Sequence, residues 1–221
     1  MPAEPPAYLS LLLQAIEACA TLAFALSGLL EAARKRLDVV GVCLVAGLTA
    51  FGGGTLRDVL LDRRPFFWVE HATWLWVLLA LCLAAMLLLR ARHFALTERA
   101  MQWPDALGLG LFSASGTQIA LAQGLPAIVA VLMGVVTAVF GGVLRDIVCN
   151  EIPRAFSDHR PYAVCAFAGG WVLVGARAFG LDDASALLAA AATATGLRVL
   201  ALLMRARLPG WTAKPDAEAD R

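Results

Sequence analysis

The sequence predicts an all-α polytopic membrane protein made of two inverted copies of a three-helix unit plus one further helix. Composition and an internal repeat carry this prediction. Hydrophobic residues make up 60% of the 221 residues and charged residues only 16%, whereas soluble domains carry about 25% charged residues. Such a chain has too few polar groups to cover a surface that faces water. Its net charge of +1 gives no reason to expect nucleic acid as a partner.

The internal repeat centres on two glycine-rich stretches. Residues 49–58 read TAFGGGTLRD, and residues 137–146 read TAVFGGVLRD. The two stretches are 88 positions apart in the chain. The same offset relates further pairs: Ser27 and Ser115, Gly28 and Gly116, Pro65 and Pro153, and, more loosely, Glu17 and Asp105. A repeat of this length indicates that each half of the protein is one structural unit.

Seven stretches qualify as membrane spans, each of which needs about 20 mostly apolar residues. They cover about residues 9–30, 39–61, 72–89, 104–123, 126–149, 162–179 and 184–204. Asp38 is placed to cap the first turn of the second span, and Pro126 suits the first turn of the fifth. We expect a single membrane domain over residues 1–221. Its parts are repeat A at about 9–90, repeat B at about 104–180, an extra helix at about 184–204 and a polar tail at 205–221.

The basic residues predict an orientation, because cytoplasmic loops carry the excess of Lys and Arg. Thirteen of them follow spans one, three, five and seven, whereas four lie on the other side. This distribution predicts a bacterial inner-membrane protein with its N-terminus outside and its C-terminus in the cytoplasm. Each copy has an odd number of spans, so the second copy enters from the opposite side. That is the inverted-repeat plan of many transporters.

The glycines are expected to break the second and fifth spans. They are Gly52, Gly53 and Gly54 in the first copy and Gly141 and Gly142 in the second. Non-helical backbone at membrane depth is tolerated where it is buried in protein or lines a wet cavity. Its freed carbonyls favour cations and its freed amides favour anions. From the rise per residue, we expect the two breaks to flank the bilayer centre without meeting. The alternative is that the glycines let helices pack closely.

Polar side chains near the glycines are candidates for lining and gating. The hydroxyl groups are those of Ser27, Ser115, Thr49 and Thr137. The charged pairs Arg57-Asp58 and Arg145-Asp146 are neighbours in sequence, so their side chains are not expected to face each other on a helix. The arginines either reach the membrane interface or set the charge at the two mouths of a conduit. Glu17 is either an intramembrane acid with a function or an interfacial residue near the start of the first span, and we favour the second; Asp105 is expected at the interface.

Nothing in the sequence indicates an enzyme, since no nucleophile–base constellation stands out. The five cysteines are scattered singly and the three histidines are isolated, so no metal site or cofactor is expected.

At this point the residues resemble a known family. Seven spans, an inverted 3+3 repeat plus one helix, and GGxLRD in spans two and five are similar to the prokaryotic trimeric intracellular cation (TRIC) channels. Bacterial members of that family are also called glycine-transporter-like membrane proteins. The resemblance covers about residues 9–205. It implies a homotrimer in membrane lipid, with one pore per protomer lined by kinked spans two and five, which passes K⁺ and other monovalent cations. Phe140 departs from the triple-glycine pattern, because it stands where the first copy has Gly52.

Three functions remain open from the residues. The first is a monovalent-cation channel, and the second is a secondary transporter for a small zwitterion such as glycine. The third is a non-conducting scaffold held together by small residues. A site that holds K⁺ would also hold an ammonium group, so the sequence does not separate the first two.

Overall fold

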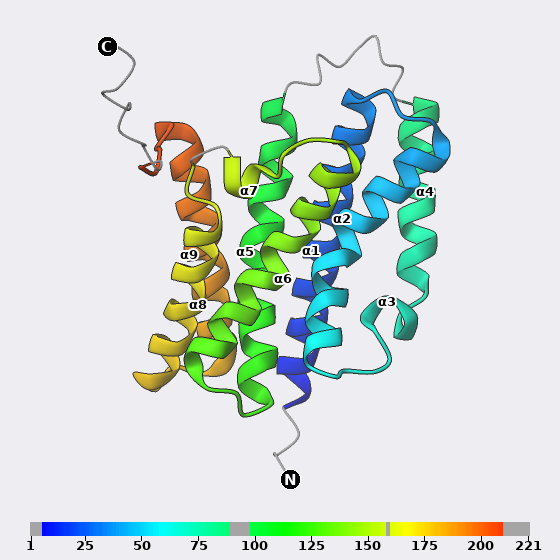
Figure 1. Cartoon of the computed structure of the whole chain (residues 1–221). Helices are drawn as coiled ribbons and strands as arrows, with labels where there is room; N and C mark the ends of the chain where they lie inside the picture. The colour runs from blue at the N-terminus through cyan, green and yellow to red at the C-terminus, as the bar shows by residue number, and fades with distance from the viewer. Residues whose placement is uncertain (1–5, 89–97, 158–159, 210–221) are drawn as a thin grey trace, which may run out of the picture.

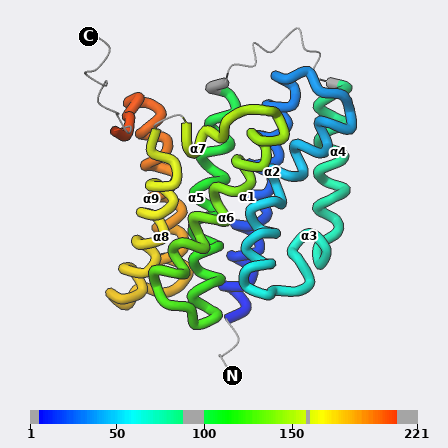
Figure 2. Tube along the Cα trace, viewed as in Figure 1, coloured from blue at the N-terminus to red at the C-terminus, as the bar shows by residue number. Residues whose placement is uncertain are grey.

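The computed structural model describes residues 6–88, 98–157 and 160–209, and every regular element in these ranges is an α-helix (Figures 1 and 2). Arg90, Arg92 and the tail from residue 210, which the orientation argument uses, lie outside the described residues, as does the side chain of Arg99. The helices are α1 (Ala7–Arg34), α2 (Val39–Leu60), α3 (Phe67–Glu70), α4 (Thr73–Leu88), α5 (Glu98–Ala122), α6 (Ala127–Val148), α7 (Arg154–Ser157), α8 (Ala163–Ala178) and α9 (Asp183–Met204).

The seven long helices follow the seven predicted spans in order. The predicted cap is confirmed, because the Asp38 carboxylate accepts a hydrogen bond of 2.8 Å from the backbone N–H of Gly41. Pro126 is the N-cap residue of α6 and not its first helical residue. The fourth span begins earlier than expected, at Glu98, because Pro104 is accommodated inside α5.

Four of these helices are long and apolar enough to cross a membrane: α1, α2, α6 and α9. Helices α4 and α8 are apolar but have 16 residues each. At 1.5 Å per residue they measure about 24 Å, which is short of the roughly 30 Å hydrocarbon core. The chain is therefore an all-α polytopic protein, and a count of seven membrane crossings stays a prediction.

The inverted repeat is visible in the helix bounds. Helix α6 begins and ends 88 positions after α2, and each is followed by a short helix, α3 or α7. Both helices end in the same way, since Asp62 and Asn150 adopt left-handed backbone angles of φ 50° and 57°. In Figure 1, α2 runs downward and α6 runs upward, as inversion requires.

The glycines do not interrupt their helices, so the expectation of broken spans is wrong. Helical structure continues without a gap through residues 52–54 in α2 and 141–142 in α6. Glycine lowers helix stability by about 1 kcal/mol relative to alanine, but the α-helical backbone of both helices continues across the glycines. That satisfies the membrane's demand for paired backbone groups without a break.

The glycines instead allow α2 and α6 to cross in backbone contact, which is the close-packing alternative. A Cβ atom on Gly53 would lie 2.0 Å from the carbonyl oxygen of Thr137, and one on Gly141 would lie 2.3 Å from that of Thr49. The two glycine stretches therefore meet at one crossing, and the expectation that they stay apart is also wrong. Only residues without a side chain permit so close an approach.

Helix α9, which has no counterpart in the repeat, packs against α5 and α8. Its Arg198 is buried and donates a hydrogen bond of 2.9 Å to the carbonyl oxygen of Pro161. The guanidinium also lies over the ring of Tyr162, 4.7 Å from its centroid. The added helix is thus fixed to repeat B by a cation as well as by apolar packing.

Candidate functional site

The first copy places Arg57 inside the helix bundle, near the end of α2. Its Nη1 donates a short hydrogen bond to Glu17 of α1, and its Nε donates to Asp58 at 2.9 Å. The Arg57 side chain is fully buried, and Glu17 exposes only 7% of its surface. Arg63 adds an outer contact of 3.3 Å to Asp58. Two buried carboxylates thus hold one buried guanidinium.

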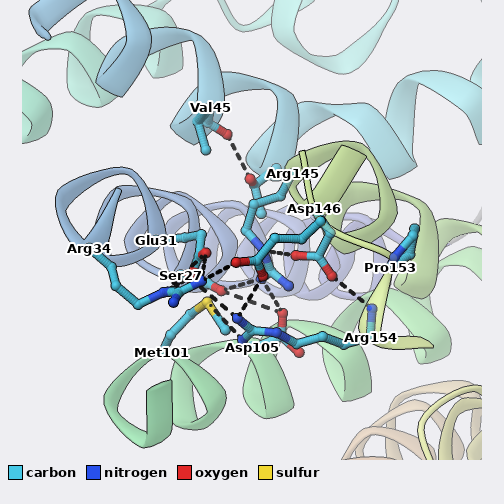
Figure 3. A network of polar contacts seen from close by, with 12 residues as sticks. Ser27, Glu31, Arg34, Val45, Met101, Asp105, Arg145, Asp146, Pro153 and Arg154 are labelled. Atoms are coloured by element: carbon cyan, nitrogen blue, oxygen red, sulfur yellow. Dashed lines mark hydrogen bonds and ion pairs between the residues drawn. The ribbon is translucent and has the colours of Figure 1, made fainter. Parts of the chain in front are cut away.

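The second copy repeats this arrangement at the end of α6. Arg145 Nη1 donates to Asp105 of α5 at 2.7 Å, and its Nε donates to Asp146 at 2.8 Å. All three side chains are buried. Asp146 also accepts a hydrogen bond of 2.9 Å from the backbone N–H of Arg154. Figure 3 shows Asp105 and Asp146 on two sides of the guanidinium.

These contacts decide between alternatives and correct two expectations for the charged residues. Of the two alternatives for the arginines, the buried position inside the bundle is the one observed, and Glu17 and Asp105 are buried and not interfacial. The neighbouring arginine and aspartate of each copy do make contact, because both side chains turn towards the bundle interior, where the long arginine folds back. A buried guanidinium would be costly alone, but a pair of carboxylates compensates its charge.

A small cavity lies beside each arginine. The cavity in the first copy is lined by residues that include Glu17, Gly54, Thr55, Arg57 and Asp58. Their repeat equivalents line the cavity in the second copy: Asp105, Gly142, Val143, Arg145 and Asp146. Each cavity has a volume of only about 10 Å³, which is room for about one water molecule. Because α2 and α6 run in opposite directions, the two cavities lie towards opposite ends of the bundle.

Two phenylalanines and the glycine crossing occupy the middle of the bundle. Phe24 and Phe112 are repeat equivalents, both buried, with ring centroids 5.4 Å apart. A Cβ atom on Gly141 would lie 3.6 Å from the Phe24 ring. The crossing of α2 and α6 and the ring pair therefore pack together between the two arginine sites.

The four candidate hydroxyl groups are all buried, but they differ in their partners. Thr49 and Thr137 donate within their own helices, to the carbonyl oxygens of Val45 at 2.6 Å and Met133 at 2.7 Å. Ser27 of α1 accepts a hydrogen bond of 2.7 Å from Arg145. Ser115 of α5 has no hydrogen-bond partner among the described residues.

Among the described residues, the Arg145 end carries an additional ion-pair network that has no equivalent at the Arg57 end (Figure 3). Buried Glu31 pairs with Arg34 at 2.5 Å, and Arg34 also reaches Glu151 at 2.6 Å. Glu151 contacts Lys35 at 2.5 Å. Hydrogen bonds from Lys35 and Arg34 lower the pKa of Glu151 to about 2. The network ties the end of α1 to the loop after α6.

The sequence reasoning missed this network, the two phenylalanines and the contacts of Arg198. A signal existed for the phenylalanines, because they obey the 88-residue offset. The sequence also contains a signal for the acid–arginine pairs, since Glu17 precedes Arg57 and Asp105 precedes Arg145 by the same 40 positions. Glu31, Arg34 and Arg198 have no repeat equivalents of their kind, so no such signal marked them.

Comparisons with known sequences agree with the repeat. A family model described as Glycine transporter matches residues 14–90 and again residues 102–178, two matches that are themselves 88 positions apart. A UPF0126 membrane protein of Vibrio cholerae is 36% identical over 198 residues, which is 90% of this chain and 82% of the relative. The UPF0126 inner membrane protein YadS of Escherichia coli is 37% identical over 156 residues, 69% of this chain and 72% of the relative.

Comparisons with solved structures give the same fold. A structure of the TRIC trimeric intracellular cation channel orthologue from Rhodobacter sphaeroides is similar with a TM-score of 0.79 and 34% identity. The match covers 90% of this chain and 99% of that one. A prokaryotic TRIC channel solved in 0.5 M KCl is similar with a TM-score of 0.80 and 25% identity, over 89% of this chain and 98% of the other.

Proposed function

Because this chain belongs to the TRIC family of cation channels and glycine-transporter-like membrane proteins, we propose that it is a channel for monovalent cations, K⁺ among them. The proposed pore lies inside each protomer of a homotrimer. It follows α2 and α6 from the Arg57 cavity to the Arg145 cavity. The candidate lining residues remain Gly52, Gly53, Gly54, Gly141, Gly142, Thr49, Thr137, Ser27 and Ser115.

The observation that supports this proposal best is the pair of buried carboxylates at each end of the route. Each arginine is held by two of them, so each ionised trio alone carries a net charge of −1. Arg63 also contacts Asp58 at the first end, and Arg154 and Arg198 also line the cavity at the second. The carboxylates beside each small cavity attract cations. The helices are continuous, so these carboxylates replace the freed carbonyls expected from the sequence as the source of cation preference.

The structure has the features of a closed state of such a pore. The cavities are small, and the glycine crossing and the Phe24–Phe112 pair fill the space between them. Conduction therefore requires α2 and α6 to separate at the crossing. We assign Arg57, Asp58, Arg145 and Asp146 to gating, since each arginine ties α1 or α5 to α2 or α6. No carbonyl filter of the TVGYG type is present in the sequence, so we propose weak discrimination between K⁺ and Na⁺.

The membrane setting follows from the same features. We propose a bacterial inner-membrane location, in keeping with the inner membrane relative of Escherichia coli. The end of the bundle that carries Arg34, Lys35 and Arg154 is assigned to the cytoplasm by the excess of basic residues. The first residue of α1 then lies outside and the last residue of α9 inside.

Recording from the purified protein in a planar bilayer with a KCl gradient tests the proposal. The parent is expected to show discrete currents whose reversal potential lies near the equilibrium potential of K⁺ and far from that of Cl⁻. Asp105→Asn makes the second trio neutral and is expected to move the reversal potential towards zero. Glu70→Gln removes an exposed carboxylate at the end of α3 and serves as the matched control. The absence of any current from folded trimers would reject the channel.

The second candidate is a transporter of a small zwitterion such as glycine. Each cavity offers a guanidinium and two carboxylates, which are the partners that the carboxylate and ammonium of an amino acid require. The description of the matched family points the same way. Uptake of labelled glycine into proteoliposomes, saturable and without unitary currents, would favour this function over the channel.

A further inference from the structure

Ser27 and Ser115 are repeat equivalents in opposite situations. Both hydroxyl groups are fully buried. Ser27, on α1 of repeat A, accepts a hydrogen bond from Arg145 of repeat B at 2.7 Å and donates to Asp105 at 3.4 Å. This serine therefore ties the two repeats together at the Arg145 end, as Figure 3 shows.

Inversion of the repeat assigns an equivalent tie to the other end, between Ser115 of α5 and Arg57 of α2. That bond is not made. The nitrogens of Arg57 are directed to Glu17 and Asp58, both in its own repeat. The Ser115 hydroxyl has no hydrogen-bond partner among the described residues. A buried hydroxyl without a partner is unfavourable and rare in folded proteins.

The two ends of the molecule are thus in different states although their residues match. At the Arg145 end, the hydrogen bond from Arg145 to Ser27 joins the two repeats. At the Arg57 end, the equivalent hydrogen bond from Arg57 to Ser115 is absent. In transporters built from inverted repeats, one repeat rocks against the other so that the two ends of the route open in turn. Applied here, this rocking releases Ser27 from Arg145 and joins Ser115 to Arg57.

We propose that Ser27 and Ser115 are alternative ties, each closing one end of the conduit in one of two conformations. Ser115 is the group that receives Arg57 when the Arg145 end opens. This inference rests on the second candidate function, the transporter, because a conduit that is closed at one end in either conformation exchanges its substrate and does not pass ions continuously. It predicts that the two gates are coupled, because the same rocking of the repeats that makes one bond breaks the other.

Accessibility of a single cysteine next to the second gate tests the proposal. The background is a variant in which Cys19, Cys43, Cys82, Cys149 and Cys165 are replaced. Val143→Cys places a thiol in the wall of the Arg145 cavity, and its rate of modification by a small membrane-impermeant reagent reports opening of that end. Thr55→Cys, the repeat-equivalent position in the other cavity, is measured in parallel.

Each serine is then changed to alanine in the Val143→Cys background. Ser27→Ala removes the tie of the observed state and is expected to raise the rate about tenfold, because hydrogen bonds to charged groups are among the stronger ones. Ser115→Ala removes the tie of the other state, so it is expected to lower the rate about tenfold by population shift. At Thr55→Cys the Ser115→Ala change is expected to have little effect, since that end is already untied.

Ser113→Ala is the matched control. It removes a buried serine hydroxyl from the same helix, but that hydroxyl donates to the Ala166 carbonyl at 2.6 Å and joins neither arginine. Ser115→Thr keeps the hydroxyl and is expected to stay near the parent rate, which covers the case in which the alanine variant does not fold. An unchanged or raised rate in folded Ser115→Ala would overturn the proposal and leave Ser115 as a packing residue or a site for a buried water.

The labelling assay does not need ion flow, so it separates the two proposals. Currents with unchanged labelling rates would reject the alternative ties and keep the channel. The expected labelling pattern without any current would reject the channel and keep a two-state protein of the transporter kind.

Discussion

Replacing Gly53 with alanine is the most direct test of the helix crossing. The added Cβ would lie 2.0 Å from the carbonyl oxygen of Thr137 and 3.0 Å from its carbonyl carbon. Ordinary contacts between heavy atoms lie near 3.5 Å, so α2 and α6 must separate by roughly 1 Å or more. The carbonyl group of Thr137 is held in its helix and cannot move away by a change of rotamer, as the end of a side chain can. Overpacking of this kind costs about 1–3 kcal/mol, and we expect Gly53→Ala to lower the stability of the protein by that amount.

The neighbouring glycines provide graded controls. At Gly52 the Cβ would meet the end of the Leu144 side chain at 2.6 Å, which can move, and at Gly54 its nearest neighbour would be Arg57 Nη2 at 4.0 Å. Alanine favours helix over glycine by about 1 kcal/mol, so Gly54→Ala should be neutral or stabilising. Gly141→Ala should resemble Gly53→Ala, since its Cβ would meet the Thr49 carbonyl oxygen at 2.3 Å.

The assay is thermal unfolding of the purified protein in detergent, followed by loss of the folded peak in gel filtration. The expected order of stability is Gly54→Ala first, then Gly52→Ala, with Gly53→Ala and Gly141→Ala lowest. If Gly53→Ala and Gly54→Ala have the same melting temperature, the two backbones are not in contact and the crossing described above is wrong.

Three further predictions concern charge. Glu17→Ala leaves Arg57 buried with one carboxylate fewer and should lower stability by about 3–5 kcal/mol, measured as loss of folded protein on heating; survival at the parent's melting temperature would contradict the buried pair. Glu151 has a folded pKa of about 2, below its unfolded value near 4.3, so its stabilising effect is complete above that value and is lost as pH falls towards 2. Between pH 8 and pH 6 the melting temperature should therefore show no pH dependence that arises from Glu151, and Glu151→Gln should flatten the decline below pH 4. In a variant without native cysteines, Lys35→Cys should react with membrane-impermeant reagents only from the cytoplasmic side. Labelling of this cysteine by a reagent added outside intact cells would contradict the proposed orientation.

The helices and the repeat were predictable because both are properties of the chain itself. Apolar runs fixed the bounds of α2 and α6 closely, and Asp38 marked a start through its short polar side chain. The repeat appeared as a constant offset of 88 residues, which needs no knowledge of contacts.

The role of the glycines was not predictable from α2 alone. Helix propensity counts three successive glycines as a break, whereas the structure keeps the helix because a second backbone packs on that face. That benefit depends on Thr137, which lies far along the chain. The burial of Glu17 and Arg57 escaped prediction for a similar reason. An acid near the end of a predicted span is predicted to be interfacial unless its buried partner is known, and that partner lies on another helix.

The ion-pair network at one end also bears on how the chain is inserted during synthesis. Repeat B has Ile119, Ala122 and Gln123 where repeat A has Glu31, Arg34 and Lys35, so the basic pair that follows the first span has no counterpart in repeat B. A nascent repeat A without this pair would have a weaker preference between its two insertions. In the proposed orientation, Arg34 and Lys35 first act as free cations that favour a cytoplasmic position for their loop. They become partners of Glu151 only after α6 has been made. The same residues thus serve biogenesis early and the folded protein late, and a substitution at either should disturb both the share of correctly inserted molecules and the stability of those that insert.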